Sequence, residues 1–106
     1  MRMNRTRINI RENSWMAMLA ALKLGEPAVA ITIGNTIHLY KTRKDIFLSN
    51  EKWVRHELKH VEQFRRYGFL RFIILYISES IRKGYYNNRF EVEARKAEDK
   101  HIEIWS

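Results

Sequence analysis

Residues 55–60 read Arg-His-Glu-Leu-Lys-His, which places two histidines four positions apart with a glutamate directly after the first. In a helix, residues four apart lie one turn apart on the same face, so His56 and His60 can bind one metal ion. Zinc accepts imidazole nitrogens in tetrahedral sites. Glu57 would face the remaining coordination position and take a proton from a water molecule whose pKa zinc lowers to about 7. The spacing therefore predicts a zinc site that hydrolyses peptide bonds.

The pattern of the surrounding helix favours an inward position for Glu57. At about 100° per residue, one arc of this helix carries charged side chains, which we expect to face solvent: Arg55, Lys59, Glu62 and Arg66. Glu62 can pair with Arg66 one turn later. The opposite side is apolar, and Glu57 projects into it. Because a buried carboxylate is costly unless it is paired or bound to a metal, Glu57 needs a partner. Alternatively, Glu57 pairs with a core arginine and the histidines are ordinary residues at the rim.

Two histidines leave a catalytic zinc site incomplete, because such sites have three protein ligands and one open position. The chain has no cysteine, so the third ligand must be His, Asp or Glu. The metzincin pattern would need Gly at position 63 and His at position 66, but the sequence has Gln63 and Arg66 there.

The segment 87–99 offers glutamates that could complete the site from a later helix. Helix geometry does not choose between Glu91 and Glu93, which flank the apolar face of that helix about equally. Asp99 and His101 are further candidates, and Glu98 is expected to support a ligand or to lie on the surface. With Asn88 as the N-cap, Glu91 could instead be the glutamate of a capping box.

The segments HELKHVEQ (56–63) and NNRFEVEA (87–94) resemble the gluzincin metallopeptidases and, more narrowly, their minimal single-domain members, the minigluzincins. In those proteins a β-hairpin similar to ITIGNTI (31–37) precedes the His-Glu-x-x-His helix, and a glutamate helix follows an apolar helix. The resemblance covers about residues 28–100, although many members carry proline where Arg89 stands. It implies that Glu91 is the third zinc ligand, because the ligand glutamate is typically followed by a small residue three positions on, here Ala94.

The elements that must position these residues can be read from periodicity and helix-ending residues. The predicted order is a short strand at 7–10, a helix capped by Asn13 or Ser14 and running to about residue 24, a hairpin at 28–40 with its turn at 34–35, a connection at 41–50, and helices at 51–67, 70–82 and 89–100. This order predicts an α+β fold in one domain, residues 1–106, with a small antiparallel sheet packed on about four helices.

The resemblance also implies how a substrate is held. Gluzincins pair an extended peptide with an edge strand of the sheet, and we expect Thr36–Tyr40 to be that strand, with Thr36, Ile37 and His38 contacting the substrate. A donor that stabilises the tetrahedral intermediate is also required. The sequence does not select among four candidates, Tyr85, Tyr86, Arg95 and His101.

The last six residues, 101–106, contain two isoleucines and a tryptophan that would be poorly hydrated if exposed. We therefore expect this tail to dock in the apolar cleft beside the metal, and the resemblance implies a latent enzyme whose cleft is blocked in this way. Simple continuation of the last helix is the alternative.

The formal charge of +8 is spread along the chain and does not form one block. We interpret it as a solvated surface, so no nucleic acid or membrane partner is expected. The apolar run 69–77 contains Arg71 and is too short to span a bilayer, and the N-terminal segment fits a signal peptide poorly. The predicted protein is a cytoplasmic zinc peptidase acting on peptides or proteins. The alternatives are a zinc-binding regulatory module without catalysis, a basic nucleic-acid-binding domain and a membrane-surface protein.

Overall fold

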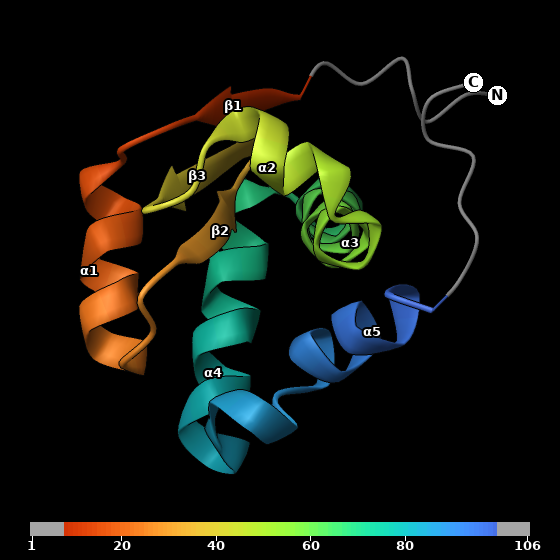
Figure 1. Cartoon of the computed structure of the whole chain (residues 1–106). Coiled ribbons are helices and arrows are strands. Elements are labelled where there is room, and N and C mark those ends of the chain that lie inside the picture. The colour runs from red at the N-terminus through yellow and green to blue at the C-terminus, as the bar shows by residue number, and fades with distance from the viewer. Residues whose placement is uncertain (1–7, 100–106) are drawn as a thin grey trace, which may run out of the picture.

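The computed structural model describes residues 8–99. Within this range the chain forms a small sheet and five helices (Figure 1). The elements are β1 (Asn9–Arg11), α1 (Trp15–Leu24), β2 (Val29–Ile33), β3 (Thr36–Tyr40), α2 (Lys44–Ser49), α3 (Glu51–Tyr67), α4 (Phe69–Asn87) and α5 (Arg89–Ala97). The predicted α+β class is confirmed.

The sheet has the strand order β1–β3–β2. β2 and β3 form the predicted antiparallel hairpin, in which Ile31 lies opposite His38, and Gly34 supplies the left-handed backbone of the turn with φ 66°. β1 pairs with β3 in parallel, Ile10 opposite Ile37, so the sheet is mixed and not purely antiparallel as expected.

The prediction that Thr36–Tyr40 is an edge strand is wrong. β1 occupies the second side of β3, which makes β3 the central strand and leaves β2 at the edge. Ile37, His38 and Leu39 are all buried, because helices cover both faces of the sheet here. The pairing of β1 brings together segments far apart in the sequence, and the pattern of either strand alone does not reveal it.

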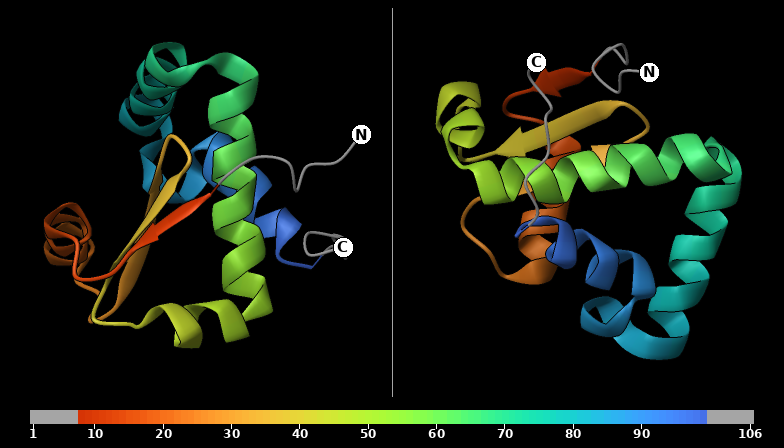
Figure 2. Two further views of the ribbon diagram at one scale, coloured as in Figure 1. Left: turned by 90° about the horizontal axis from the view of Figure 1, so that it is seen from above. Right: turned by 90° about the vertical axis from the view of Figure 1, so that its right-hand side faces the viewer.

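Helices pack on both faces of the sheet, as Figure 2 shows in its left-hand view. On one face α1 places Ala17 and Ala21 against Val29. This helix starts at Ser14, whose hydroxyl accepts a hydrogen bond from the Ala17 amide, and ends at Gly25 with φ 72°. The other face packs on α2 and α3 through Ala30, Ile37, Leu39, Phe47, Val54 and Val61. The helix α2 lies in the segment expected to be a connection, and it contributes the fully buried Phe47.

α3, α4 and α5 follow one another like three sides of a U, as the right-hand view of Figure 2 shows. α3 begins after Asn50, whose side chain accepts a hydrogen bond from the Trp53 amide, and ends at Gly68. α4 is broken at Gly84, whose φ of 83° and ψ of 164° are not helical. This break lies two residues after the end predicted for the helix at 70–82. Phe64, Phe72 and Phe90 pack together between these helices. After α4 the chain therefore turns back toward α3, so that α5 lies beside α3.

The charged arc expected on α3 faces solvent only in part. The Arg55 side chain is 15% exposed, because its guanidinium donates two hydrogen bonds, of 2.9 and 2.7 Å, to the backbone carbonyl of Glu98. Glu62 pairs with Lys59 at 2.6 Å, not with Arg66 as expected. Arg55 therefore ties α3 to the end of α5.

Candidate metal centre

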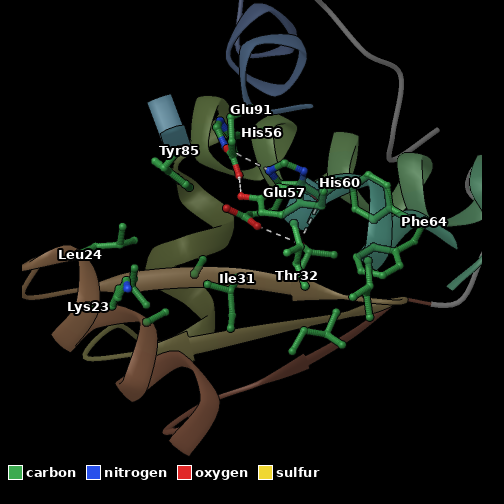
Figure 3. Close-up of a pocket in the computed structure, with 18 residues that line it drawn as sticks. Lys23, Leu24, Ile31, Thr32, His56, Glu57, His60, Phe64, Tyr85 and Glu91 are labelled. Atoms are coloured by element: carbon green, nitrogen blue, oxygen red, sulfur yellow. Dashed lines mark hydrogen bonds and ion pairs between the residues drawn. The ribbon is translucent and has the colours of Figure 1, made fainter. Parts of the chain in front are cut away.

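Side chains from α3 and α5 meet in one cluster (Figure 3). The Nε2 atom of His56 lies 3.2 Å from Glu91 Oε1, and the Nε2 atom of His60 lies 3.3 Å from the same oxygen. The three residues offer ligand atoms that all lie within 4.8 Å of one another. Two imidazole nitrogens and one carboxylate oxygen are the donor set of many catalytic zinc sites, so this group could hold a metal ion.

The second nitrogen of each imidazole has its own acceptor. His56 Nδ1 contacts Glu98 Oε2 at 2.7 Å, and His60 Nδ1 contacts Gln63 Oε1 at 2.8 Å. The Gln63 amide nitrogen donates to the Phe90 carbonyl and to Glu93, which identifies its oxygen as the acceptor. Both histidines therefore donate from Nδ1 and turn Nε2 toward Glu91. Loss of the Nε2 proton would leave that nitrogen free to bind a metal, with Nδ1 still held by its own acceptor.

Glu91 and Glu93 differ in where their carboxylates lie. Glu91 is buried and contacts both histidines, and its second oxygen accepts a hydrogen bond from the Tyr76 hydroxyl. Glu93 instead accepts the hydrogen bond from Gln63 at 2.7 Å. Asp99 pairs with Lys52 on the surface, and His101 lies outside the described residues. Glu91 is thus the third member of the cluster, and Glu98 supports His56 as expected.

The corner between α4 and α5 aims Glu91 at the histidines. Asn88 is fully buried, and its side chain accepts from the Phe90 amide at 2.8 Å while donating to the Tyr76 carbonyl and to Ser80. The predicted N-cap is therefore correct. The buried Glu79 carboxylate accepts from the Arg89 amide at 3.1 Å. These contacts fix the first turn of α5, where Glu91 stands.

The electrostatics of the cluster favour a bound cation. Burial alone would raise the pKa of Glu91, but hydrogen bonds from His56 and His60 and the charge of His60 hold it well below its usual range. Burial lowers the pKa of His60, but its hydrogen bond and charge interaction with Glu91 outweigh this effect and raise the pKa to about 9. Without a metal, a proton supplies the positive charge that the buried carboxylate requires.

Glu57 lies next to the cluster and is 4% exposed, as the sequence predicted for an inward carboxylate. Its Oε1 accepts a hydrogen bond of 2.8 Å from the Thr32 hydroxyl, which comes from the edge strand β2. Burial raises the pKa of Glu57, against the opposing charges of His60 and His56 and the Thr32 hydrogen bond. Its partner is therefore a threonine beside the histidines, not a core arginine.

Two pockets open beside these residues. The first, of about 450 Å³, lies between α1, β2, α3 and α4, and its lining includes His56, Glu57, His60 and Glu91. The second, of about 510 Å³, lies toward the end of α5 and shares His56 and Glu57 with the first. Both pockets are lined in part by residues of the edge strand β2.

Of the donor candidates that the structure describes, only Tyr85 lines these pockets, and it lines both. Burial and the nearby charge of Glu91 raise its pKa well above the usual value for tyrosine. Tyr86 and Arg95 pair with each other, the guanidinium lying 3.9 Å from the ring centroid, and His101 lies outside the described residues. The expected tail contact also falls on residues that the structure does not describe.

The substrate contacts expected from Thr36, Ile37 and His38 do not fit the structure. None of the three lines either pocket, because the strand is central. The His38 imidazole instead lies 2.9 Å from the Ser14 hydroxyl at the start of α1. The pocket-lining strand is β2.

Sequence reasoning did not find Thr32, Gln63 and Tyr76. Gln63 stands three positions after His60 on the same helix face, so helical spacing could have indicated it. Tyr76 belongs to an apolar helix and Thr32 to a hairpin, and only the packing of those elements brings their hydroxyls to Glu91 and Glu57.

Comparison with known proteins gives one family. The family model of the eCIS core domain matches residues 8–68, more than half of the chain. The chain belongs to the eCIS core domain family. The domain that defines this family is a small domain of contractile injection systems. No comparison supports the narrower resemblance to minigluzincins. The match spans β1 to α3 and includes His56, Glu57 and His60, whereas Glu91 lies beyond it.

No curated protein and no solved structure matches the chain. Among the described residues, no helix has the length and apolar character needed to cross a membrane.

Proposed function

We propose that this chain is a zinc-dependent peptidase of the gluzincin type. The observation that carries the proposal is the convergence of His56 Nε2, His60 Nε2 and Glu91 Oε1 beside the buried Glu57 carboxylate, at the wall of an open pocket. Structural zinc sites are closed by four protein ligands, whereas catalytic sites keep one position open. Three protein ligands facing a pocket support the catalytic alternative.

His56, His60 and Glu91 would hold the ion, with Glu98 and Gln63 fixing the imidazoles through their Nδ1 protons. Zinc bound there would polarise a water molecule and a substrate carbonyl and lower the pKa of the water toward neutrality. Tyr76 holds the second oxygen of Glu91, so this ligand cannot swing away without losing a buried hydrogen bond.

Glu57 would serve as general base and then as general acid. Its carboxylate accepts a proton from the attacking water and later donates that proton to the nitrogen of the cleaved amide, which leaves as an amine. Burial raises the pKa of Glu57, and a carboxyl group with a raised pKa is suited to both steps. Thr32 keeps one carboxylate oxygen in place. Tyr85, which lines the pocket beside the cluster, would donate a hydrogen bond to the developing oxyanion.

The test of the proposal is metal content followed by hydrolysis. Protein purified without chelators should contain close to one zinc per chain and cleave a mixed peptide substrate, and a chelator should stop cleavage. Protein that holds no zinc and takes none up would refute the proposal. Zinc without cleavage of any peptide would instead favour the non-catalytic zinc module.

Removing the support of His56 should weaken zinc binding. In Glu98→Ala the imidazole loses the acceptor of its Nδ1 proton, and we expect zinc affinity to fall about 10–100-fold, as is typical for such partners. Asp99→Ala is the matched control, because this neighbouring carboxylate pairs only with the exposed Lys52 in the described structure. Competition with a chromophoric chelator measures both affinities, and equal values would exclude the role given to Glu98.

The latent state is part of the proposal and depends on residues 101–106, outside the described range. We expect deletion of this segment to increase the rate of peptide cleavage, because Ile102, Ile104 and Trp105 would compete with a substrate for the apolar pocket. Initial rates of the full and shortened chains at equal zinc content measure the effect. An unchanged rate would show that the segment does not block the site.

A further inference from the structure

The helix α4, which forms the outer side of the U in the right-hand view of Figure 2, exposes a line of large aliphatic side chains. Four of them are more than half exposed: Leu70, Ile74, Ile77 and Ile81. At about 100° and 1.5 Å per residue, these four lie within an arc of about 60° and extend over about 16 Å of the helix. We call them the apolar stripe. Single exposed apolar residues are common on protein surfaces, but a continuous group of them indicates a binding surface.

The part of the chain that carries the apolar stripe is strongly basic. Residues 65–89 contain six basic residues and one acidic residue, a net charge of +5 out of +8 for the whole chain. Within α4, Arg71 and Arg82 are both exposed, and helix geometry places both on the same side of the stripe. The positive charge that is spread along the sequence is therefore concentrated beside an apolar surface in the fold.

The one acidic residue of α4, Glu79, does not weaken this positive surface by much. Helix geometry places it on the side of α4 away from the stripe, and it is buried. Three basic side chains share its carboxylate: Arg82, Lys83 and Arg89. Because three positive charges face one negative charge, the group keeps a net positive charge.

This combination of surfaces fits a membrane with anionic lipids. Helices that lie in the membrane interface join a face of large apolar side chains to nearby lysine and arginine residues, and each basic residue close to anionic headgroups adds to binding. A nucleic acid would be attracted by the same charge, but four aliphatic side chains would gain nothing from its phosphates. Since α4 lacks the length and apolar character needed to cross a membrane, it would lie along the surface.

We infer that α4 binds the surface of membranes that contain anionic lipids, with the apolar stripe inserted among the upper parts of the acyl chains. Arg71 and Arg82 reach the headgroups, because the apolar stem of an arginine side chain can lie along the hydrocarbon while its charge stays at the interface. The inference does not depend on the proposed peptidase function, since it uses no residue of the metal centre.

The test measures binding of the full chain to vesicles of phosphatidylcholine, with and without phosphatidylserine, at low and at high salt. Ile74→Glu places a negative charge in the stripe, and Ile74 lines neither pocket beside the metal centre. Ile46→Glu on α2 is the matched control, because Ile46 is 56% exposed and Ile74 59%. Arg71→Gln removes one positive charge beside the stripe, and Lys44→Gln, also on α2, is its control. Circular dichroism checks that each variant is folded.

We expect wild type to bind the vesicles that contain phosphatidylserine far more tightly than the neutral ones, and high salt to weaken this binding. Ile74→Glu should weaken it by about 10-fold or more, and Arg71→Gln by about 5-fold, while both α2 variants should bind like wild type. Absence of binding, binding that is indifferent to phosphatidylserine, or equal effects of the α4 and α2 variants would overturn the inference.

Sedimentation velocity distinguishes the membrane from a second copy of the chain as the occupant of the stripe. We expect wild type without vesicles to sediment in the same way as Ile74→Glu. A wild-type dimer that Ile74→Glu dissociates, together with no binding to vesicles, would assign the stripe to a contact between two copies and overturn the membrane inference.

Discussion

Replacing His60 with alanine is expected to abolish stoichiometric zinc binding. His60 supplies one of three converging ligand atoms, and its Nε2 lies 3.3 Å from Glu91 Oε1. Since loss of a residue that only supports a ligand costs about 10–100-fold in affinity, loss of a ligand should cost more than that. Metal analysis of the purified variant beside wild type measures the effect.

The control for this variant is His38→Ala. His38 is also buried, but it contacts Ser14 at the start of α1 and lies outside the cluster. Either change removes a buried hydrogen bond and so destabilises the fold to some degree. Circular dichroism should therefore be recorded for both variants, and we expect both to remain folded. Zinc retained in the His60 variant, or lost equally from both, would contradict the assignment of the ligands.

Replacing Glu57 with glutamine should separate catalysis from metal binding. The change keeps the shape of the side chain and an oxygen that can accept the Thr32 hydroxyl, but it removes the group that takes up a proton. Zinc content should therefore stay at the wild-type level while kcat falls by about 10²–10⁴, the usual contribution of general acid–base catalysis. Steady-state cleavage of a peptide substrate at matched zinc content measures this fall.

Glu62→Gln is the control, because Glu62 stands on the same helix, pairs with Lys59 on the surface and lines neither pocket. Its rate should be that of wild type. A Glu57→Gln variant with undiminished cleavage would show that another group accepts the proton. A wild-type protein that binds zinc and cleaves nothing would make the chain a zinc-binding module within its family.

Local features of the sequence predicted most of the helical framework. Asn50 and Gly68 bound α3, Asn88 caps α5, and Gly84 breaks α4. Such features act between residues close in sequence, so their effects can be read without knowledge of the fold. The short α2 was missed because its stability comes from burying Phe47 under the sheet, not from its own propensity.

By itself, the sequence determined that His56 and His60 share one face of a helix and that Glu57 points inward, since helical periodicity fixes both. Only the tertiary structure decided which carboxylate reaches the histidines and which strand borders the cleft. Glu91 and Glu93 are equivalent by periodicity, and the fixed corner at Asn88 turns Glu91 toward the cluster. The edge belongs to β2 because β1 pairs with β3. These outcomes depend on contacts between residues distant in sequence, which spacing along the chain does not encode.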